Sequence, residues 1–239
     1  MSASDDRSRA PRLAGGVACA VLAGHALPGL AAAWPPLRRP LGIEDHTASG
    51  TGYAITFDDG PHPRGTPAVL EILAAAGAQA TFFLVGEQVE RAPALAGEIV
   101  AAGHEVGLHC HRHRNLLRVG PRGVREDVAR AEDCIAAATG RAPALYRPPY
   151  GILNGCALAL ARRRGWRTLL WSHWGRDWEA RATAQSIAAR ATGGVEPGSV
   201  LLLHDADDYS APGSWRRTAA ALPLIVDALA SRGLAPVAV

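Results

Sequence analysis

The sequence lacks the patterns that mark several common protein classes. It has only four cysteines in 239 residues, with no CxxC pair and no disulfide-rich spacing, so the cysteines do not reveal the compartment. Its arginines are scattered, with no run of five or six, and the net charge of +3 is only mildly basic. A nucleic-acid-binding surface is therefore not indicated. Apolar residues make up 48% of the chain, which predicts a folded core.

Charge is absent from one stretch near the N-terminus. Residues 13–34 contain no charged residue, and three arginines precede them. This length is close to the ~20 residues that a membrane helix needs, and the stretch ends in three alanines, which suits signal-peptidase cleavage. We expect residues 1–51 to be a signal peptide or membrane anchor plus a linker, in a secreted or membrane-anchored protein. A buried or surface-lying apolar helix of a cytoplasmic protein is the alternative.

Short β-prone runs alternate with alanine-rich helical stretches from Gly52 onward. Strands are predicted at 53–57, 80–85, 105–108, 144–147, 167–171, 199–204 and 235–239. Helices are predicted near 66–76, 93–103, 121–139, 154–164, 183–191 and 215–232. Such alternation is typical of an α/β fold with a parallel sheet. About seven strands in this length fit a small TIM-like (β/α) barrel better than an open sheet.

Polar residues that could carry chemistry follow the predicted strands. They are Asp58, Asp59, His109, Arg147, Asp177 and His204. Because active sites of (β/α) barrels lie at the C-terminal ends of the strands, these residues are expected to meet on one rim.

The adjacent Asp58 and Asp59 can divide two tasks. Successive residues at a strand end point in different directions, so one carboxylate can bind a metal while its neighbour stays free as a base. His109 and His113 are four residues apart, a spacing that places two imidazoles on one face of a helical turn. Two imidazoles and a carboxylate form a zinc-type ligand set with open positions. Taken singly, a polar turn and ordinary core or exposed histidines explain these motifs as well.

Two further residues have a possible role on the same rim. Arg147 can clamp a carboxylate by a forked pair, and a surface salt bridge is the alternative. His204 ends an apolar run, where a histidine is either structural or, opposite a metal-activated water, a general acid.

Five motifs, in order, resemble those of the NodB-type polysaccharide deacetylases, carbohydrate esterase family 4. They are TFDDGP (56–61), HCHRH (109–113), RPPYG (147–151), DW (177–178) and LLLH (201–204). The resemblance implies that residues 52–239 form a NodB-like catalytic domain with a deformed TIM-like barrel. It also implies a hydrolase that removes N- or O-acetyl groups from an acetylated glycan with one divalent metal, usually Zn²⁺, with Co²⁺ also possible.

The resemblance assigns roles by position. Asp59, His109 and His113 match the metal ligands. Asp58 matches the catalytic base and His204 the general acid.

The supporting residues follow from the same resemblance. Arg147 matches the residue that orients the base, and Asp177 the one that holds the acid. The backbone N–H of Tyr150 matches the donor to the oxyanion, and the side chains of Tyr150, Trp178 and Leu202 match the lining of the acetyl pocket.

The chain departs from the family pattern at two positions. Cys110 stands where Ser or Thr is usual, either as an inert small residue or as an extra ligand, and Trp174 stands where an acidic residue often opens the fourth motif. His111 has no family role and is expected to point to solvent. The loop at 205–215 is either a wall of the substrate groove or a plain loop.

Two other functions remain open at this point. One is a cytoplasmic metal amidohydrolase acting on a small non-peptide C–N substrate. The other is a non-enzymatic carbohydrate-binding barrel, against which the complete set of ligands, base and acid argues. We expect a monomer without nucleic-acid partners, and possible membrane association through the N-terminal segment.

Overall fold

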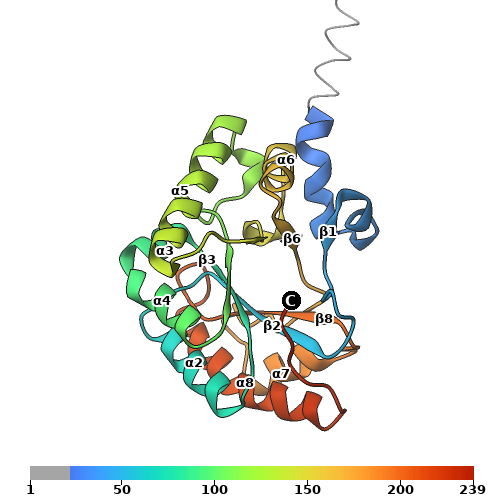
Figure 1. Ribbon diagram of the computed structural model, residues 1–239. Helices are drawn as coiled ribbons and strands as arrows, with labels where there is room; N and C mark the ends of the chain where they lie inside the picture. Colours follow the sequence, from blue (N-terminus) through green and yellow to red (C-terminus); the bar gives the residue numbers. More distant parts are fainter. Residues whose placement is uncertain (1–21) are drawn as a thin grey trace, which may run out of the picture.

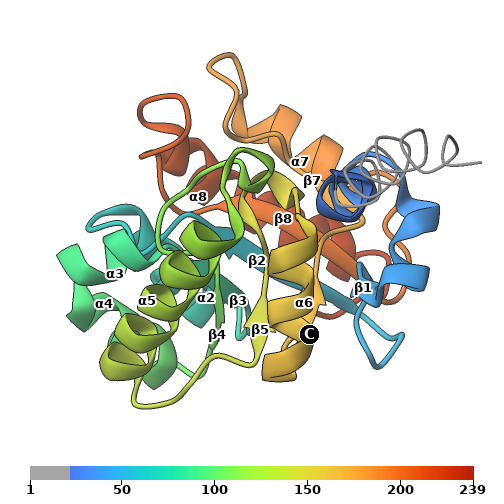
Figure 2. The same cartoon turned by 90° about the horizontal axis from the view of Figure 1, so that it is seen from above.

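The structure, a computed structural model, describes residues 22–239. Within them an eight-stranded sheet curls into a half-barrel with helices on its outside (Figures 1 and 2). The strands are β1 (Ile43–Glu44), β2 (Tyr53–Asp58), β3 (Thr81–Leu84), β4 (Glu105–Leu108), β5 (Leu145–Tyr146), β6 (Arg167–Leu169), β7 (His173–Trp174) and β8 (Ser199–His204). The predicted deformed TIM-like barrel is confirmed.

The strand order is β1-β6-β5-β4-β3-β2-β8-β7, and all neighbouring strands are parallel. The edge strands β1 and β7 are two residues long, and among the described residues they do not pair with each other. The barrel therefore stays open on one side. All strands run in one direction, so their C-terminal ends share one rim.

Seven α-helices with bounds inside the described residues accompany the strands. They are α2 (Gly65–Ala75), α3 (Gly86–Arg91), α4 (Pro93–Ala101), α5 (Pro121–Thr139), α6 (Gly155–Arg164), α7 (Ala184–Thr192) and α8 (Ser214–Ala230). Local sequence explains several ends. Pro121 opens α5, Gly140 ends it in the left-handed conformation, and Thr183 and Ser186 form a capping box at α7.

The core lies between the sheet and the helices. Every residue of β2 is buried, and β8 is buried up to His204, as expected for strands covered on both faces. Phe57 and Phe82 stack with ring centroids 5.0 Å apart. This packing holds the strand ends that carry the polar residues.

The structure differs from the prediction in the details of its elements. β1 comes from the stretch expected to be a linker, and the short α3 and β7 come from stretches expected to be loops. Residues 235–239 add no strand to the sheet. They form a single bridge, between Pro236 and Tyr53, because one edge of β2 pairs with β8 and the other pairs with β3 from Thr56 onward.

Part of the uncharged N-terminal stretch is visible. Residues 13–21 lie outside the described residues, residues 22–26 are helical, and η1 (Leu27–Ala32) follows as a 3-10 helix. Short 3-10 turns η2 (Pro35–Leu37) and η3 (Arg39–Leu41) lead to β1. From residue 22 onward, every helix is too short or too polar to cross a bilayer.

Candidate active site

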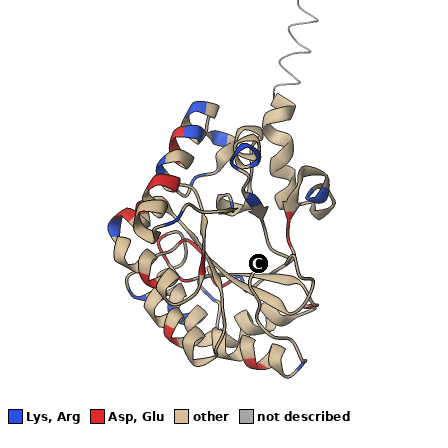
Figure 3. Ribbon diagram, in the orientation of Figure 1, with Lys and Arg blue, Asp and Glu red and all other residues tan. Residues whose placement is uncertain are grey.

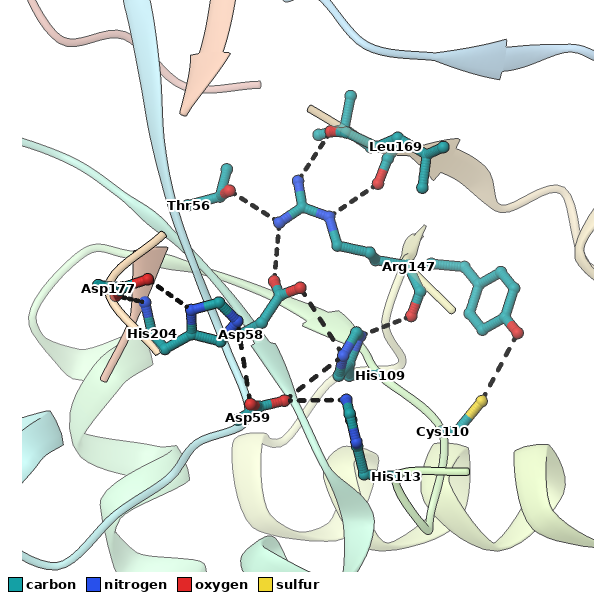
Figure 4. A network of polar contacts seen from close by, with 12 residues as sticks. Thr56, Asp58, Asp59, His109, Cys110, His113, Arg147, Leu169, Asp177 and His204 are labelled. Carbon is teal, nitrogen blue, oxygen red and sulfur yellow. Dashed lines mark hydrogen bonds and ion pairs between the residues drawn. The ribbon is translucent and has the colours of Figure 1, made fainter. Parts of the chain in front are cut away.

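The polar residues predicted from the sequence meet at one cavity. This cavity has a volume of about 260 Å³ and opens at the C-terminal ends of β2 and β8. It is lined by Asp58, Asp59, His109, His113, Tyr150, Trp171, Trp174, Trp178, Leu202, His204, Tyr209 and Ser210. Figure 4 shows the polar network beneath it, in which Arg147 and Asp177 support the lining residues from behind.

Asp58 is held by a buried arginine. Its Oδ1 accepts a hydrogen bond of 2.7 Å from Nη1 of Arg147, which is fully buried. Nε of Arg147 donates to the carbonyl oxygen of Leu169, and Nη2 donates to that of Leu170. Nη1 also donates to the Thr56 hydroxyl. Burial lowers the pKa of Arg147, and the carboxylate of Asp58 acts in the opposite direction. Arg147 therefore makes an interior charge pair that orients Asp58, and the surface salt bridge is excluded.

Asp59 faces two imidazoles. Its Oδ1 lies 3.6 Å from Nε2 of His109 and 3.4 Å from Nε2 of His113. Two ligand atoms about 2.1 Å from one ion in tetrahedral geometry are ~3.4 Å apart, so these separations suit a shared cation. Asp59 Oδ1 is buried without a hydrogen-bond partner among the described residues, a costly state that a cation would relieve.

The protonation states fit the same cation. Nδ1 of His109 lies 2.7 Å from the carbonyl oxygen of Arg147 and donates to it, which leaves the Nε2 lone pair directed at Asp59. Burial lowers the pKa of His109, and burial lowers the pKa of His113 to about 2, so both rings are neutral. Burial also raises the pKa of Asp59 to about 7, which means that its buried carboxylate lacks a positive partner. A bound cation would supply that partner. The three residues fit a divalent metal.

The two histidines are not on a helix, contrary to the spacing argument. Residues 109–113 form a bend after β4, in which Cys110 has a φ of +64°. This left-handed residue turns the chain so that His109 and His113 face each other with ring centroids 5.4 Å apart. Asp59, with a φ of +80°, makes a similar turn after β2 and separates its carboxylate from that of Asp58.

Cys110 and His111 point away from the cation group. The thiol of Cys110 lies 3.6 Å from the Tyr146 hydroxyl in the core, so the structure favours the inert residue over the extra ligand. The expectation that His111 points to solvent is wrong. Its side chain is buried, because its backbone N–H donates to Asp127 and its ring packs against Gly86.

Replacing Cys110 with serine should leave metal binding intact. The hydroxyl can hydrogen-bond to Tyr146, so we expect unchanged metal stoichiometry and a change in unfolding free energy of about 1 kcal/mol or less. Elemental analysis of the purified variant, with thermal melting on the same sample, measures both. Loss of metal with an unchanged melting curve would identify Cys110 as a ligand.

His204 is paired with Asp177 on its far side. Nδ1 of His204 lies 2.9 Å from Oδ1 of Asp177, and the His204 backbone N–H donates to Oδ2 at 2.7 Å. Thr218 donates to the same Oδ2, so the fully buried carboxylate is fixed. Burial disfavours the imidazolium, but Asp177, together with Asp59 and Asp58, raises the pKa of His204 to about 10. Nε2 is left facing the cavity, 3.9 Å from Asp59.

Aromatic side chains wall the cavity. Tyr150, Trp178 and Leu202 line it as expected, and Trp178 packs edge-on against His204 at 5.4 Å. Trp174 also lines it and is 43% exposed, so the position where the family often has an acid presents an apolar surface here. Trp171 is a lining residue that the sequence reasoning missed. Its place at the end of the predicted strand 167–171 could have indicated that it lies on the same rim.

The loop after β8 forms a wall of the cavity. Tyr209 stacks on the His113 ring with centroids 4.5 Å apart, while Tyr150 meets the same ring edge-on at 4.4 Å. The Tyr209 hydroxyl donates to Glu87 and accepts from Gln88, both on α3. The stretch 205–215 is therefore a wall of the groove, and its Tyr209 holds the His113 ring against Tyr150.

Comparison with known proteins gives the family. The family model described as polysaccharide deacetylase matches residues 45–169, more than half of the chain. The chain belongs to the polysaccharide deacetylase family. Its match to a chitooligosaccharide deacetylase of Azorhizobium caulinodans is 35% identical over 196 residues and covers 79% of this chain and 93% of that protein.

Solved structures of other family members agree. The Bc1960 peptidoglycan N-acetylglucosamine deacetylase superposes with a TM-score of 0.77 and 30% identity, covering 83% of this chain and 91% of that one. A family 4 acetyl xylan esterase of Clostridium thermocellum, solved with a cobalt ion, gives a TM-score of 0.67 and 29% identity over 77% and 86%. Members of this fold thus include deacetylases named for different glycans and an esterase solved with a cobalt ion.

Proposed function

We propose that this polysaccharide deacetylase hydrolyses acetyl groups on an N- or O-acetylated glycan and releases acetate. The observation that carries the proposal is the separation of the two carboxylates. Asp59 faces both His109 and His113 with an unpartnered buried oxygen, whereas Asp58 is held through Oδ1 by Arg147 and its Oδ2 lies near only one of the two histidines, 3.7 Å from Nε2 of His109. This is the division between ligand and base that hydrolysis of an acetyl group requires.

Asp59, His109 and His113 would hold one divalent cation. When bound, this ion would polarise the acetyl carbonyl and lower the pKa of a water molecule beside it. Asp58 takes the proton from the attacking water, and Arg147, 2.7 Å from Oδ1, holds the carboxylate in place beside the cavity. The Tyr150 backbone N–H is proposed to donate to the developing oxyanion.

The sugar nitrogen or oxygen that leaves needs a proton as it departs. His204 carries one on Nε2, because its raised pKa keeps the imidazole protonated at neutral pH. It delivers this proton to the departing sugar nitrogen or oxygen, and Asp177 stabilises the charged ring. Tyr150, Trp178 and Leu202 are proposed to enclose the acetyl methyl group, since they give the cavity its apolar lining.

We also propose Zn²⁺ as the ion and an extracytoplasmic, monomeric enzyme. Two imidazoles and one carboxylate are a set that zinc prefers, and Co²⁺ accepts the same geometry. The relatives named for peptidoglycan suggest a cell-wall glycan as the substrate, which lies outside the cytoplasm. A chelator should abolish acetate release, and stoichiometric Zn²⁺ or Co²⁺ should restore it. Full activity of protein shown by elemental analysis to be metal-free would contradict the metal assignment.

An acetate-release screen tests the substrate class. The purified enzyme should release acetate from at least one polymer or oligomer among chitooligosaccharides, peptidoglycan and acetylated xylan. Chelated enzyme is the control for background hydrolysis. Small amides, such as acetamide and N-acetylated monosaccharides, belong in the same screen. A higher kcat/KM on these than on every glycan would favour the amidohydrolase alternative.

A further inference from the structure

The described end of the uncharged stretch packs on the catalytic domain. Residues 22–34, here called the strap, lie beside α6, η4 (Leu116–Arg118) and η5 (Pro149–Gly151), at the blue end of the ribbon in Figure 1. The approach is close. A Cβ at Gly29 would lie 3.0 Å from the carbonyl oxygen of Leu153, and a Cβ at Gly155 would lie 2.2 Å from that of Gly24. The strap is therefore packed as an element of the fold.

One side of the strap is buried and held by polar contacts. Ala31 is fully buried, and Pro28 is buried beside it. Arg38, itself only 7% exposed, donates from Nε to the carbonyl oxygen of Ala31 at 3.0 Å and from Nη2 to that of Ala32 at 3.4 Å. Signal-peptidase cleavage after the three alanines would remove both acceptors and leave a buried guanidinium short of partners, which is costly.

The same arginine connects the strap to the active site. Nη1 of Arg38 donates to the carbonyl oxygen of Trp171 at 2.9 Å and pairs with Asp45 at 2.8 Å. Trp171 lines the cavity, and η5, which carries Tyr150, contacts η1. Of these two walls, η5 contacts the strap directly and Trp171 is joined to it through Arg38.

The opposite side of the strap is apolar and exposed. Leu22, Leu27, Leu30 and Trp34 are 66%, 48%, 53% and 57% exposed, and they make up half of the large apolar side chains that are exposed in residues 22–239. Figure 3 shows no charged residue on the strap, whereas α5 carries both signs along its length. Exposed apolar side chains gathered in this way mark an interaction surface.

A lipid bilayer fits this surface. The preceding residues, 13–21, are also uncharged, with Arg7, Arg9 and Arg12 before them and the exposed Arg39 after the strap. Arginines on both sides of an apolar segment suit anionic lipid headgroups, and tryptophan is favoured at the membrane interface. If this surface bound a second copy of the chain instead, residues 13–21 would not also need to be uncharged.

We propose that the strap stays in the mature enzyme and lies on the bilayer through Leu22, Leu27, Leu30 and Trp34. The catalytic domain is then seated directly on the membrane surface, and the walls formed by Trp171 and η5 are braced by the bound segment. This inference goes beyond the proposed deacetylation and does not depend on the substrate.

The mature N-terminus tests retention. The full chain is produced in an export-competent bacterium and extracted from its membrane fraction with detergent, and its intact mass and peptides are measured. We expect peptides that span residues 22–33. A homogeneous N-terminus at Trp34 would overturn the proposal.

Quenching by brominated lipid tests contact with the bilayer. Tryptophan fluorescence of the full chain is measured in vesicles of phosphatidylcholine and phosphatidylglycerol, with and without bromine on the acyl chains. We expect Trp34→Phe to lose most of the quenching and Trp215→Phe, a control on α8, to keep it. Equal quenching in both variants would overturn the proposal. So would a detergent-free dimer that Leu30→Glu splits and Leu224→Glu does not, since the strap would then cover a second copy.

Discussion

Asp58→Asn should lose nearly all turnover and keep its bound metal. The asparagine retains an oxygen that accepts from Arg147, so the packing around the fully buried guanidinium is preserved. The amide cannot take a proton, and loss of a general base costs roughly 10²–10⁴-fold in rate. The metal should stay, because Asp58 lies outside the cluster formed by Asp59, His109 and His113.

Asp59→Asn is the matched variant, since it changes the neighbouring residue in the same way. It should lose the metal and the activity together, because a carboxylate ligand becomes a weaker amide. His109→Ala should behave as Asp59→Asn does. Metal content and rate are measured on the same purified samples, with circular dichroism to confirm folding. Equal metal loss in the two asparagine variants would contradict the division of roles between the aspartates.

The second large effect concerns the acid pair, His204 and Asp177. His204 must be protonated when the leaving group departs, and its pKa is raised to about 10. Activity that depends on this proton is present below that pH and is lost as pH rises through it. Asp177→Asn removes the charge that raises the pKa, so the falling limb of kcat/KM should move to lower pH by roughly one unit or more. The rising limb should stay nearly in place.

His204→Ala completes the test of this pair. It should remove the falling limb and slow turnover by roughly 10²–10⁴-fold. Metal occupancy is checked at each pH, because a change in occupancy alters the profile independently of His204. If Asp177→Asn keeps the wild-type falling limb with metal fully bound, then Asp177 does not tune the acid.

The sequence was sufficient to predict which residues meet in the site. Asp58, His109 and His204 each stand at the end of a recognisable strand, and in a parallel sheet such ends share one rim. These features depend on periodicity and strand direction, which are local properties of the chain. The pairing of Arg147 with Asp58 followed from the family resemblance, because the residues alone left a surface salt bridge open.

Other features depend on contacts between distant segments, and the sequence did not show them. Tyr209, in the loop after β8, reaches His113 because its hydroxyl is held by Glu87 and Gln88 on α3. His111 turns inward because Cys110 adopts a left-handed conformation, which spacing alone does not predict for a cysteine. The strand β1 was assigned to a linker because two residues are too short to give a periodic signal.

The pairing of β1 with β6 has a consequence for the order of events during synthesis. Ile43 leaves the ribosome early, whereas its partner Thr168 and the surfaces of η5 and α6 are made much later. Until then the strap has no folded surface to pack against, so its apolar side chains stay uncovered. If the strap binds lipid as proposed, it can do so before these surfaces exist, and the domain then folds against a segment that is already in place.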